Sequence, residues 1–153
     1  MMVGTGAGLA LLLMFGLWLL HLRLRNAAVV DVGWTVAIGL QALVAGLMGP
    51  GDPPRRWIVA VVGMLWSARL ASHLAVRVAS EPEDARYAEI RARWGGNLAL
   101  KFLAFFLFQG ILATVLAGPF FLAAADPSPS LHPFLLAGVA LAAFADHGQG
   151  GQR

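Results

Sequence analysis

The sequence has no cysteine and few charged residues. The missing cysteines exclude disulfide bonds and thiolate metal ligands, and we predict no metal site. Charged residues make up 12% of the 153 residues, against about 25% in a soluble domain. Hydrophobic residues make up 59%, against roughly 45–50%. Because so few charges cannot cover a surface that faces water, the composition excludes a soluble globular domain and indicates an integral membrane protein.

Long apolar runs predict the transmembrane segments. A helix needs about 20 mostly apolar residues to cross the hydrocarbon core of a bilayer. Four runs have about that length, and a fifth, of 15 residues, is marginal. We predict an all-α polytopic bundle that forms one transmembrane domain over residues 1–145, followed by a disordered, glycine-rich tail over 146–153. The five predicted spans are 3–22, 27–48, 57–76, 102–125 and 131–145.

Two segments rich in proline and glycine, 49–56 and 126–130, are predicted turns. A longer polar stretch separates the third and fourth spans. In it, Ser80 and Glu83 have the spacing of a capping box, and Pro82 suits a first helical turn. The apolar side of this stretch is thin, so we predict a helix over residues 81–94 that lies at the membrane interface.

The basic residues predict the orientation. Two segments that share a side of the membrane hold seven of them, whereas the N-terminus and the other two turns hold only Arg55 and Arg56. The positive-inside rule places the basic segments in the cytoplasm, the N-terminus outside and the C-terminus inside, in a bacterial inner membrane. In so apolar a chain, a net charge of +3 points to anionic lipid, and we expect no nucleic-acid partner. The seven residues are Arg23, Arg25, Arg77, Arg86, Arg91, Arg93 and Lys101.

Ionisable side chains inside spans are costly and therefore mark candidate functional sites. Trp66, Arg69, His73 and Arg77 are spaced by three or four residues, which places them on one stripe of the third span. Guanidinium groups suit a phosphorylated or carboxylated ligand because they donate in pairs. In the structural alternative, Arg77 reaches the headgroups and Arg69 pairs with Asp31.

Other polar side chains occur at a similar depth. Asp31 and Trp34 lie on the second span and Gln109 on the fourth. Asp31 is a candidate counter-ion, helix-terminal charge or proton-handling group, Trp34 a candidate interface anchor, and Gln109 a candidate interhelical hydrogen-bonding group. Together with Arg69 they predict a cavity in the cytoplasmic half. Such a cavity would attract an anion, either a nucleotide cofactor or a lipid headgroup.

At these residues the chain resembles a known family, the uncharacterised bacterial membrane proteins related to steroid 5-alpha-reductases. The resemblance covers about residues 26–121 and depends on the order and spacing of four blocks. They are Asp31-Val32-Gly33-Trp34; the segment 65–74 with Arg77; Glu83-Asp84-Ala85-Arg86-Tyr87 with Arg91; and Phe108-Gln109.

The resemblance implies an enzyme that uses NADPH to reduce a carbon–carbon double bond conjugated to a carbonyl, in a steroid or other isoprenoid lipid. It implies that Arg69, His73 and Arg77 face the cofactor phosphates. Asp84, Arg86, Tyr87 and Arg91 would form a cytoplasmic lid that also binds the cofactor, and Asp31, Trp34, Trp66 and Gln109 would line the substrate cavity. Because Tyr87 is predicted outside the membrane, no catalytic residue is assigned.

The chain departs from this family near its end. The Arg-His-Pro-Asn-Tyr type block of the family's late cofactor site is absent; His132-Pro133 follows the fourth predicted span and matches only part of it. We therefore expect a C-terminally truncated chain, which leaves its activity open. Two alternatives are a methyltransferase of the isoprenylcysteine type and a lipid-binding subunit without enzymatic activity.

Overall fold

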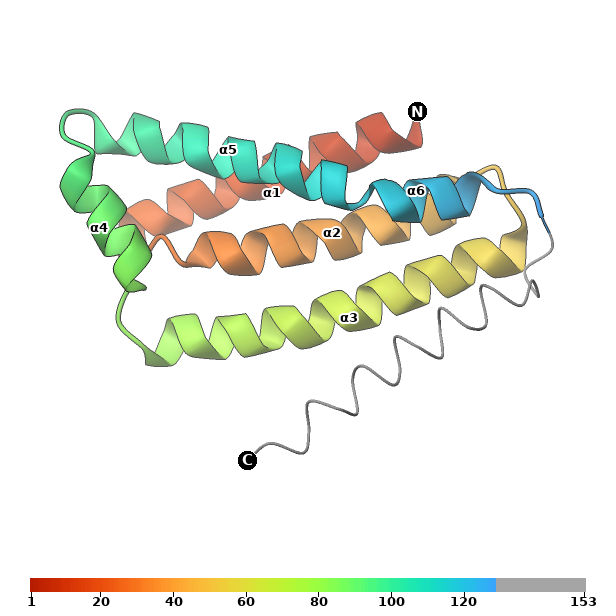
Figure 1. The fold of residues 1–153 in the computed structure, drawn as a ribbon, viewed down its shortest axis with the longest axis horizontal. Coiled ribbons are helices and arrows are strands. Elements are labelled where there is room, and N and C mark those ends of the chain that lie inside the picture. The colour runs from red at the N-terminus through yellow and green to blue at the C-terminus, as the bar shows by residue number, and fades with distance from the viewer. Residues whose placement is uncertain (129–153) are drawn as a thin grey trace.

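The structure, a computed structural model, describes residues 1–128, and within them every regular element is a helix (Figure 1). The all-α prediction is confirmed. The predicted fifth span (131–145), the tail (146–153) and the His132-Pro133 pair lie outside the described residues. The six helices are α1 (Met2–Leu24), α2 (Val29–Met48), α3 (Pro53–Ser80), α4 (Ala85–Arg93), α5 (Leu98–Leu116) and α6 (Gly118–Ala125).

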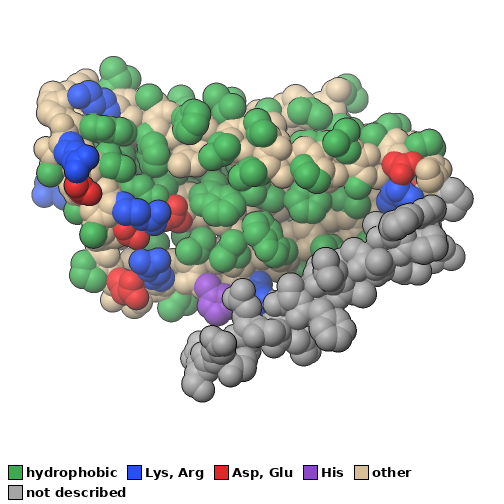
Figure 2. All heavy atoms as spheres, viewed as in Figure 1, with side chains coloured by type: hydrophobic (Ala, Val, Ile, Leu, Met, Phe, Trp, Pro, Cys, Tyr) green, Lys and Arg blue, Asp and Glu red, His purple; other side chains and the backbone are tan. Residues whose placement is uncertain are grey.

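In the described part of the chain, four helical segments are long and apolar enough to cross a membrane: α1, α2, α3, and α5 together with α6. Figure 2 shows hydrophobic side chains over the middle of the molecule and charged side chains gathered near its two ends. This distribution is the one expected of a bundle whose middle faces lipid. The chain is an integral membrane protein.

Helix α2 is the centre of the bundle, with α1 and α5 on one side and α3 on the other (Figure 1). In α2, 67% of the apolar window is buried, against 17–22% in the other three segments. Small residues bring α2 and α3 close together: a Cβ on Gly39 would lie 2.3 Å from the Ser67 hydroxyl oxygen. That hydroxyl donates a hydrogen bond of 2.9 Å to the carbonyl of Thr35, an interhelical bond of the kind that polar residues make in membranes.

Helix α3 is longer than predicted at both ends. It begins at Pro53, so the second half of the predicted turn 49–56 is helical. Proline is tolerated there because the first turn needs no backbone donor, and the Asp52 side chain caps the helix by accepting from the amide of Arg55 at 3.4 Å. At the other end α3 continues to Ser80, past the predicted limit at residue 76.

The predicted span 102–125 is two helices. Helix α5 begins at Leu98, and the chain turns at Ala117 before α6 begins at Gly118. Pro119 explains the break, because proline has no amide hydrogen to donate and its ring clashes with the preceding turn.

The predicted interfacial helix 81–94 is shorter, and its predicted capping box is wrong. The last residue of α3 is Ser80, whose hydroxyl donates to the carbonyl of Val76 at 2.8 Å. Helix α4 begins only at Ala85, with Asp84 as its N-cap. It lies across one end of the bundle and does not run alongside the spans (Figure 1).

The bundle thus has two ends, which we call the α4 end and the α6 end. The α4 end holds α4, the turn between α1 and α2, and the end of α3. The α6 end holds α6 and the turn between α2 and α3, where the amide of Gly51 donates to the carbonyl of Ala124 at 3.0 Å.

Candidate functional site at the α4 end

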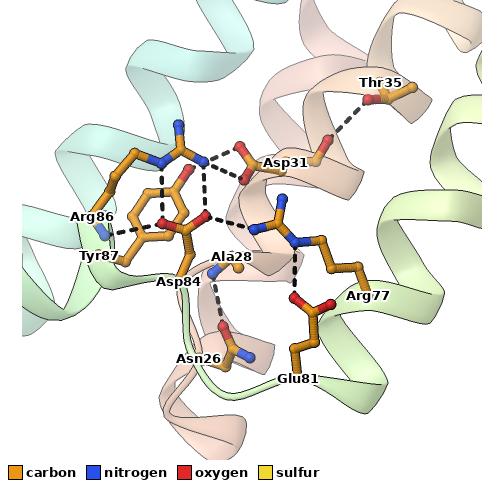
Figure 3. Close-up of polar contacts among 9 residues, drawn as sticks. All are labelled: Asn26, Ala28, Asp31, Thr35, Arg77, Glu81, Asp84, Arg86 and Tyr87. Carbon is orange, nitrogen blue, oxygen red and sulfur yellow. Dashed lines mark hydrogen bonds and ion pairs between the residues drawn. The ribbon is translucent and has the colours of Figure 1, made fainter.

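Asp31 lies in the first turn of α2, where a carboxylate is favoured by the helix dipole. The hydroxyl of Tyr87 donates a hydrogen bond of 2.8 Å to its Oδ1, and the guanidinium of Arg86 lies 3.6 Å from its Oδ2 (Figure 3). Both partners belong to α4. Tyr87 is only 5% exposed, so the tyrosine predicted to lie in an outer lid is buried against the bundle.

Asp84 organises the start of α4. Its carboxylate accepts from the amide of Arg86 at 3.0 Å and from the Arg86 guanidinium at 3.1 Å. Arg77 of α3 reaches the same carboxylate at 3.3 Å and also pairs with Glu81 at 3.1 Å (Figure 3). Asp84 therefore caps α4 and ties it to the end of α3.

Glu83 attaches the connection between α3 and α4 to the turn between α1 and α2. Its Oε1 accepts from the amide of Ala27 at 2.7 Å and from Arg91 at 2.8 Å. The guanidinium of Arg91 also lies 5.0 Å from the centre of the Phe102 ring, within the range of a cation–π contact. Glu83 was predicted to belong to a local capping box. Nothing in its spacing indicates that its partner is Ala27, 56 residues away.

The charges of this cluster act on one another. The hydrogen bonds from Arg86 lower the pKa of Asp84 to about 2, so its carboxylate is ionised at neutral pH. Asp84 in turn raises the pKa of Arg86. Burial, followed by the hydrogen bond to Asp31, raises the pKa of Tyr87. Tyr87 is thus a protonated hydrogen-bond donor at neutral pH, and Asp31 is its acceptor.

A small pocket lies against this cluster, with a cavity volume of about 40 Å³. That volume holds a few water molecules. The charged residues that line it are Asp31, Arg77, Glu81 and Asp84, and Leu74 and Val78 supply apolar walls.

The structure brings together five of the predicted site residues, Asp31, Arg77, Asp84, Arg86 and Tyr87, with Arg91 held beside them through Glu83. Asp31, predicted to line the cavity, therefore lies in one cluster with residues that were predicted to form the lid. Asp31 accepts its hydrogen bond from Tyr87 and is paired with Arg86, and both belong to the predicted lid. The predicted counter-ion of Asp31 was Arg69.

The other predicted residues of the α3 stripe lie elsewhere. Trp66, Arg69 and His73 are on the exposed face of α3, whereas Ser67 and Gly63 face α2. Trp34 and Gln109 share a different, mostly apolar pocket of about 130 Å³ between α2 and α5. The predicted cavity residues are thus distributed over more than one place.

The chain matches, over residues 17–147, the family described as "Protein of unknown function (DUF1295)". This protein belongs to that family. Searches of curated proteins and of solved structures found no match. Within residues 1–128, no group of three or more His, Asp or Glu side chains is arranged to hold a metal ion.

Proposed function

We propose that this member of the DUF1295 family is a membrane reductase of the 5-alpha-reductase kind. It would use NADPH to reduce a carbon–carbon double bond conjugated to a carbonyl, in an isoprenoid or steroid lipid. The observation that carries the proposal is the hydrogen bond from Tyr87 to Asp31, placed beside exposed guanidinium groups at one end of an apolar bundle. The α4 end would face the cytoplasm, where the cofactor is present, because most basic residues lie there.

Tyr87 and Asp31 would polarise the substrate. Tyr87 holds its proton at neutral pH and donates a hydrogen bond from a buried position. On substrate binding, the single hydroxyl proton of Tyr87 would transfer its hydrogen bond from Asp31 to the substrate carbonyl oxygen, where a donor stabilises the negative charge that develops during reduction. Asp31 orients the Tyr87 hydroxyl, so Asp31 is a positioning residue. When bound, NADPH would supply the hydride to one carbon of the double bond, and water or a polar side chain would supply the proton that the other carbon takes up.

The donor groups of the α4 end fit a phosphorylated cofactor. Arg77, Arg86 and Arg91 offer planar, paired donors of the kind that bind phosphate. Each is paired with a carboxylate, but their side chains are 56%, 68% and 32% exposed. Ion pairs this exposed are worth only about 0–1 kcal/mol, so a phosphate can compete for the guanidinium groups. The small pocket beside Asp31 is too small for a dinucleotide, which would have to lie over the exposed surface.

The test uses the full chain in lipid nanodiscs. NADPH absorbance is followed after addition of lipid-soluble enones, with Tyr87→Phe and an exposed control, Glu89→Gln. We expect NADPH consumption, a loss of about 100-fold or more in Tyr87→Phe, and no change in Glu89→Gln. In parallel, thermal stability is measured with NADPH and with S-adenosylmethionine, because a ligand stabilises the state that binds it. Stabilisation by S-adenosylmethionine alone would favour the methyltransferase alternative and refute the proposal.

A further inference from the structure

An apolar groove runs between α1 and α3 near the α4 end, with α2 as its floor. Its cavity volume is about 450 Å³, within the range of about 300–1,000 Å³ usual for ligand pockets. Its one polar lining residue is Asn26. The apolar lining residues are Leu17, Leu20 and Leu24 of α1, Val29 and Val32 of α2, and Ala75, Val78 and Ala79 of α3.

This groove and the small polar pocket are neighbours that share one lining side chain. Val78 lines both of them. On α2 the two sites are also lined by adjacent residues, since Asp31 lines the pocket and Val32 the groove. A molecule that occupies both must therefore pass around Val78, with its apolar part in the groove and its polar part beside Asp31.

The polar pocket limits the chemistry of that polar part. At about 40 Å³ it has room for a single small group. Its charged lining is three carboxylates, Asp31, Glu81 and Asp84, against one guanidinium, Arg77. Phosphate is large and negatively charged, so both volume and charge disfavour it. A hydroxyl or ketone suits the pocket because it is small and uncharged: a hydroxyl can donate to a carboxylate, and a ketone can accept from Arg77.

The groove limits the chemistry of the apolar part. Its outer α1 wall is exposed, with Leu20 at 42% and Leu24 at 54%, and α1 and α3 are both membrane-crossing segments. Within residues 1–128, the α1 wall of the groove is therefore accessible to the bilayer at Leu20 and Leu24. A flexible chain can fill such a groove while the rest of the chain stays in the membrane.

We propose that the α1–α3 groove holds the hydrocarbon chain of an uncharged long-chain lipid ketone or alcohol, whose oxygen reaches the Asp31 pocket around Val78. The reaction of the bound lipid rests on the proposed function, whereas the binding of the lipid does not. It assigns the site to a lipid with a flexible chain in preference to a fused-ring steroid, and it makes Val78 and Ala79 determinants of specificity.

The test measures binding without NADPH. The full chain in nanodiscs is labelled with a long-chain ketone that carries a photoreactive diazirine near the end of its chain. Ala79→Phe fills the groove, Val78→Ala opens the partition, and Ala68→Phe is a matched control at another exposed alanine of α3. We expect at least a tenfold loss of affinity in Ala79→Phe, on the order seen when a pocket is filled by a larger side chain. Affinity should be kept or increased in Val78→Ala and unchanged in Ala68→Phe.

Competition identifies the occupant. An unlabelled long-chain alcohol should displace the probe, whereas a fused-ring enone steroid and phosphatidylglycerol should each need at least about tenfold higher concentration. Equal displacement by the steroid or by the phospholipid overturns the assignment, as does unchanged labelling in an Ala79→Phe chain with wild-type thermal stability. If Ala79→Phe is unstable, Ala79→Leu replaces it. If the probe binds as expected but no NADPH is consumed, the proposed reaction is refuted and the lipid site is retained. If NADPH is consumed equally by the wild-type chain and by Ala79→Phe, the lipid site is refuted and the proposed reaction is retained.

Discussion

The two ends of the bundle are closed in different ways. At the α6 end, backbone meets backbone: the amides of Gly51 and Asp52 donate to the carbonyls of Ala124 and Asp126, and Arg55 pairs with Asp126. At the α4 end, side chains make the connections, and they surround a pocket. Direct backbone contact leaves no room for a ligand, whereas side-chain pairs can exchange partners. The comparison agrees with a proposal in which the α6 end stabilises the fold and the α4 end carries the proposed function.

The largest effect that tests this contrast is expected at Gly51. A Cβ there would lie 2.4 Å from the carbonyl oxygen of Asp126, so Gly51→Ala must push the two backbones apart. We expect a loss of about 1–3 kcal/mol in the free energy of unfolding, as for other overpacked sites. Thermal unfolding in detergent measures it. The matched control is Gly95→Ala, because a Cβ on Gly95 meets nothing within 4 Å. Equal stability of the two variants would contradict the tight closure of the α6 end.

At the α4 end, Glu83→Ala should release α4 with a smaller loss of stability. It removes the acceptor for the Ala27 amide and the partner of Arg91, which we expect to cost about 1–2 kcal/mol. Hydrogen exchange should increase over residues 84–93 while the spans stay protected. Glu89→Ala is the control, since its pair with Arg93 is exposed and worth at most about 0.5 kcal/mol. Unchanged exchange in Glu83→Ala would show that α4 is held by other contacts.

Between the two ends, Gln41 offers a change of the opposite sign. It is fully buried on α2, and among residues 1–128 neither its amide nitrogen nor its amide oxygen has a hydrogen-bond partner. An apolar side chain of similar size removes that desolvation penalty, so Gln41→Leu should raise stability by about 1 kcal/mol. Gln41→Ala leaves a cavity and should not. A fall in stability for Gln41→Leu would mean that the amide has a partner in the membrane.

Acid should break the contacts of Asp84 only at low pH. Asp84 has a pKa of about 2 in the folded protein, against 3.8 ordinarily. A lowered carboxyl pKa contributes stability above the ordinary value, and this is lost as pH falls from about 4 to about 2. Hydrogen exchange of α4, corrected for its intrinsic pH dependence, should therefore increase below about pH 4 in the wild-type chain, and this increase should be absent from Asp84→Asn. An equal increase in both chains would contradict the Asp84–Arg86 pairing.

The spans could be predicted from the sequence because length and hydropathy decide them. Their ends could not, since these depend on single residues: Pro53 begins a helix, whereas Pro119 explains why one ends. The same residue type has opposite effects depending on whether the preceding turn is already helical.

The composition of the site was predictable, and its geometry was not. Spacing placed Trp66, Arg69, His73 and Arg77 on one stripe but could not show which face of α3 packs against α2. The small residues Gly63 and Ser67 were the available signal, because close helix contacts in membranes favour small side chains. Tyr87 is hydrogen-bonded to Asp31, 56 residues away, and no local pattern in the sequence indicates such a contact.

The central claim is that Asp31 and Tyr87 act as one unit that joins α4 to the bundle. A double-mutant cycle with Asp31→Ala and Tyr87→Phe, read as the free energy of unfolding in detergent, tests it directly. We predict a coupling energy of roughly 1 kcal/mol, within the usual range for residues in contact. Effects of the two substitutions that simply add, within about 0.3 kcal/mol, would show that the two side chains do not interact and would remove the site.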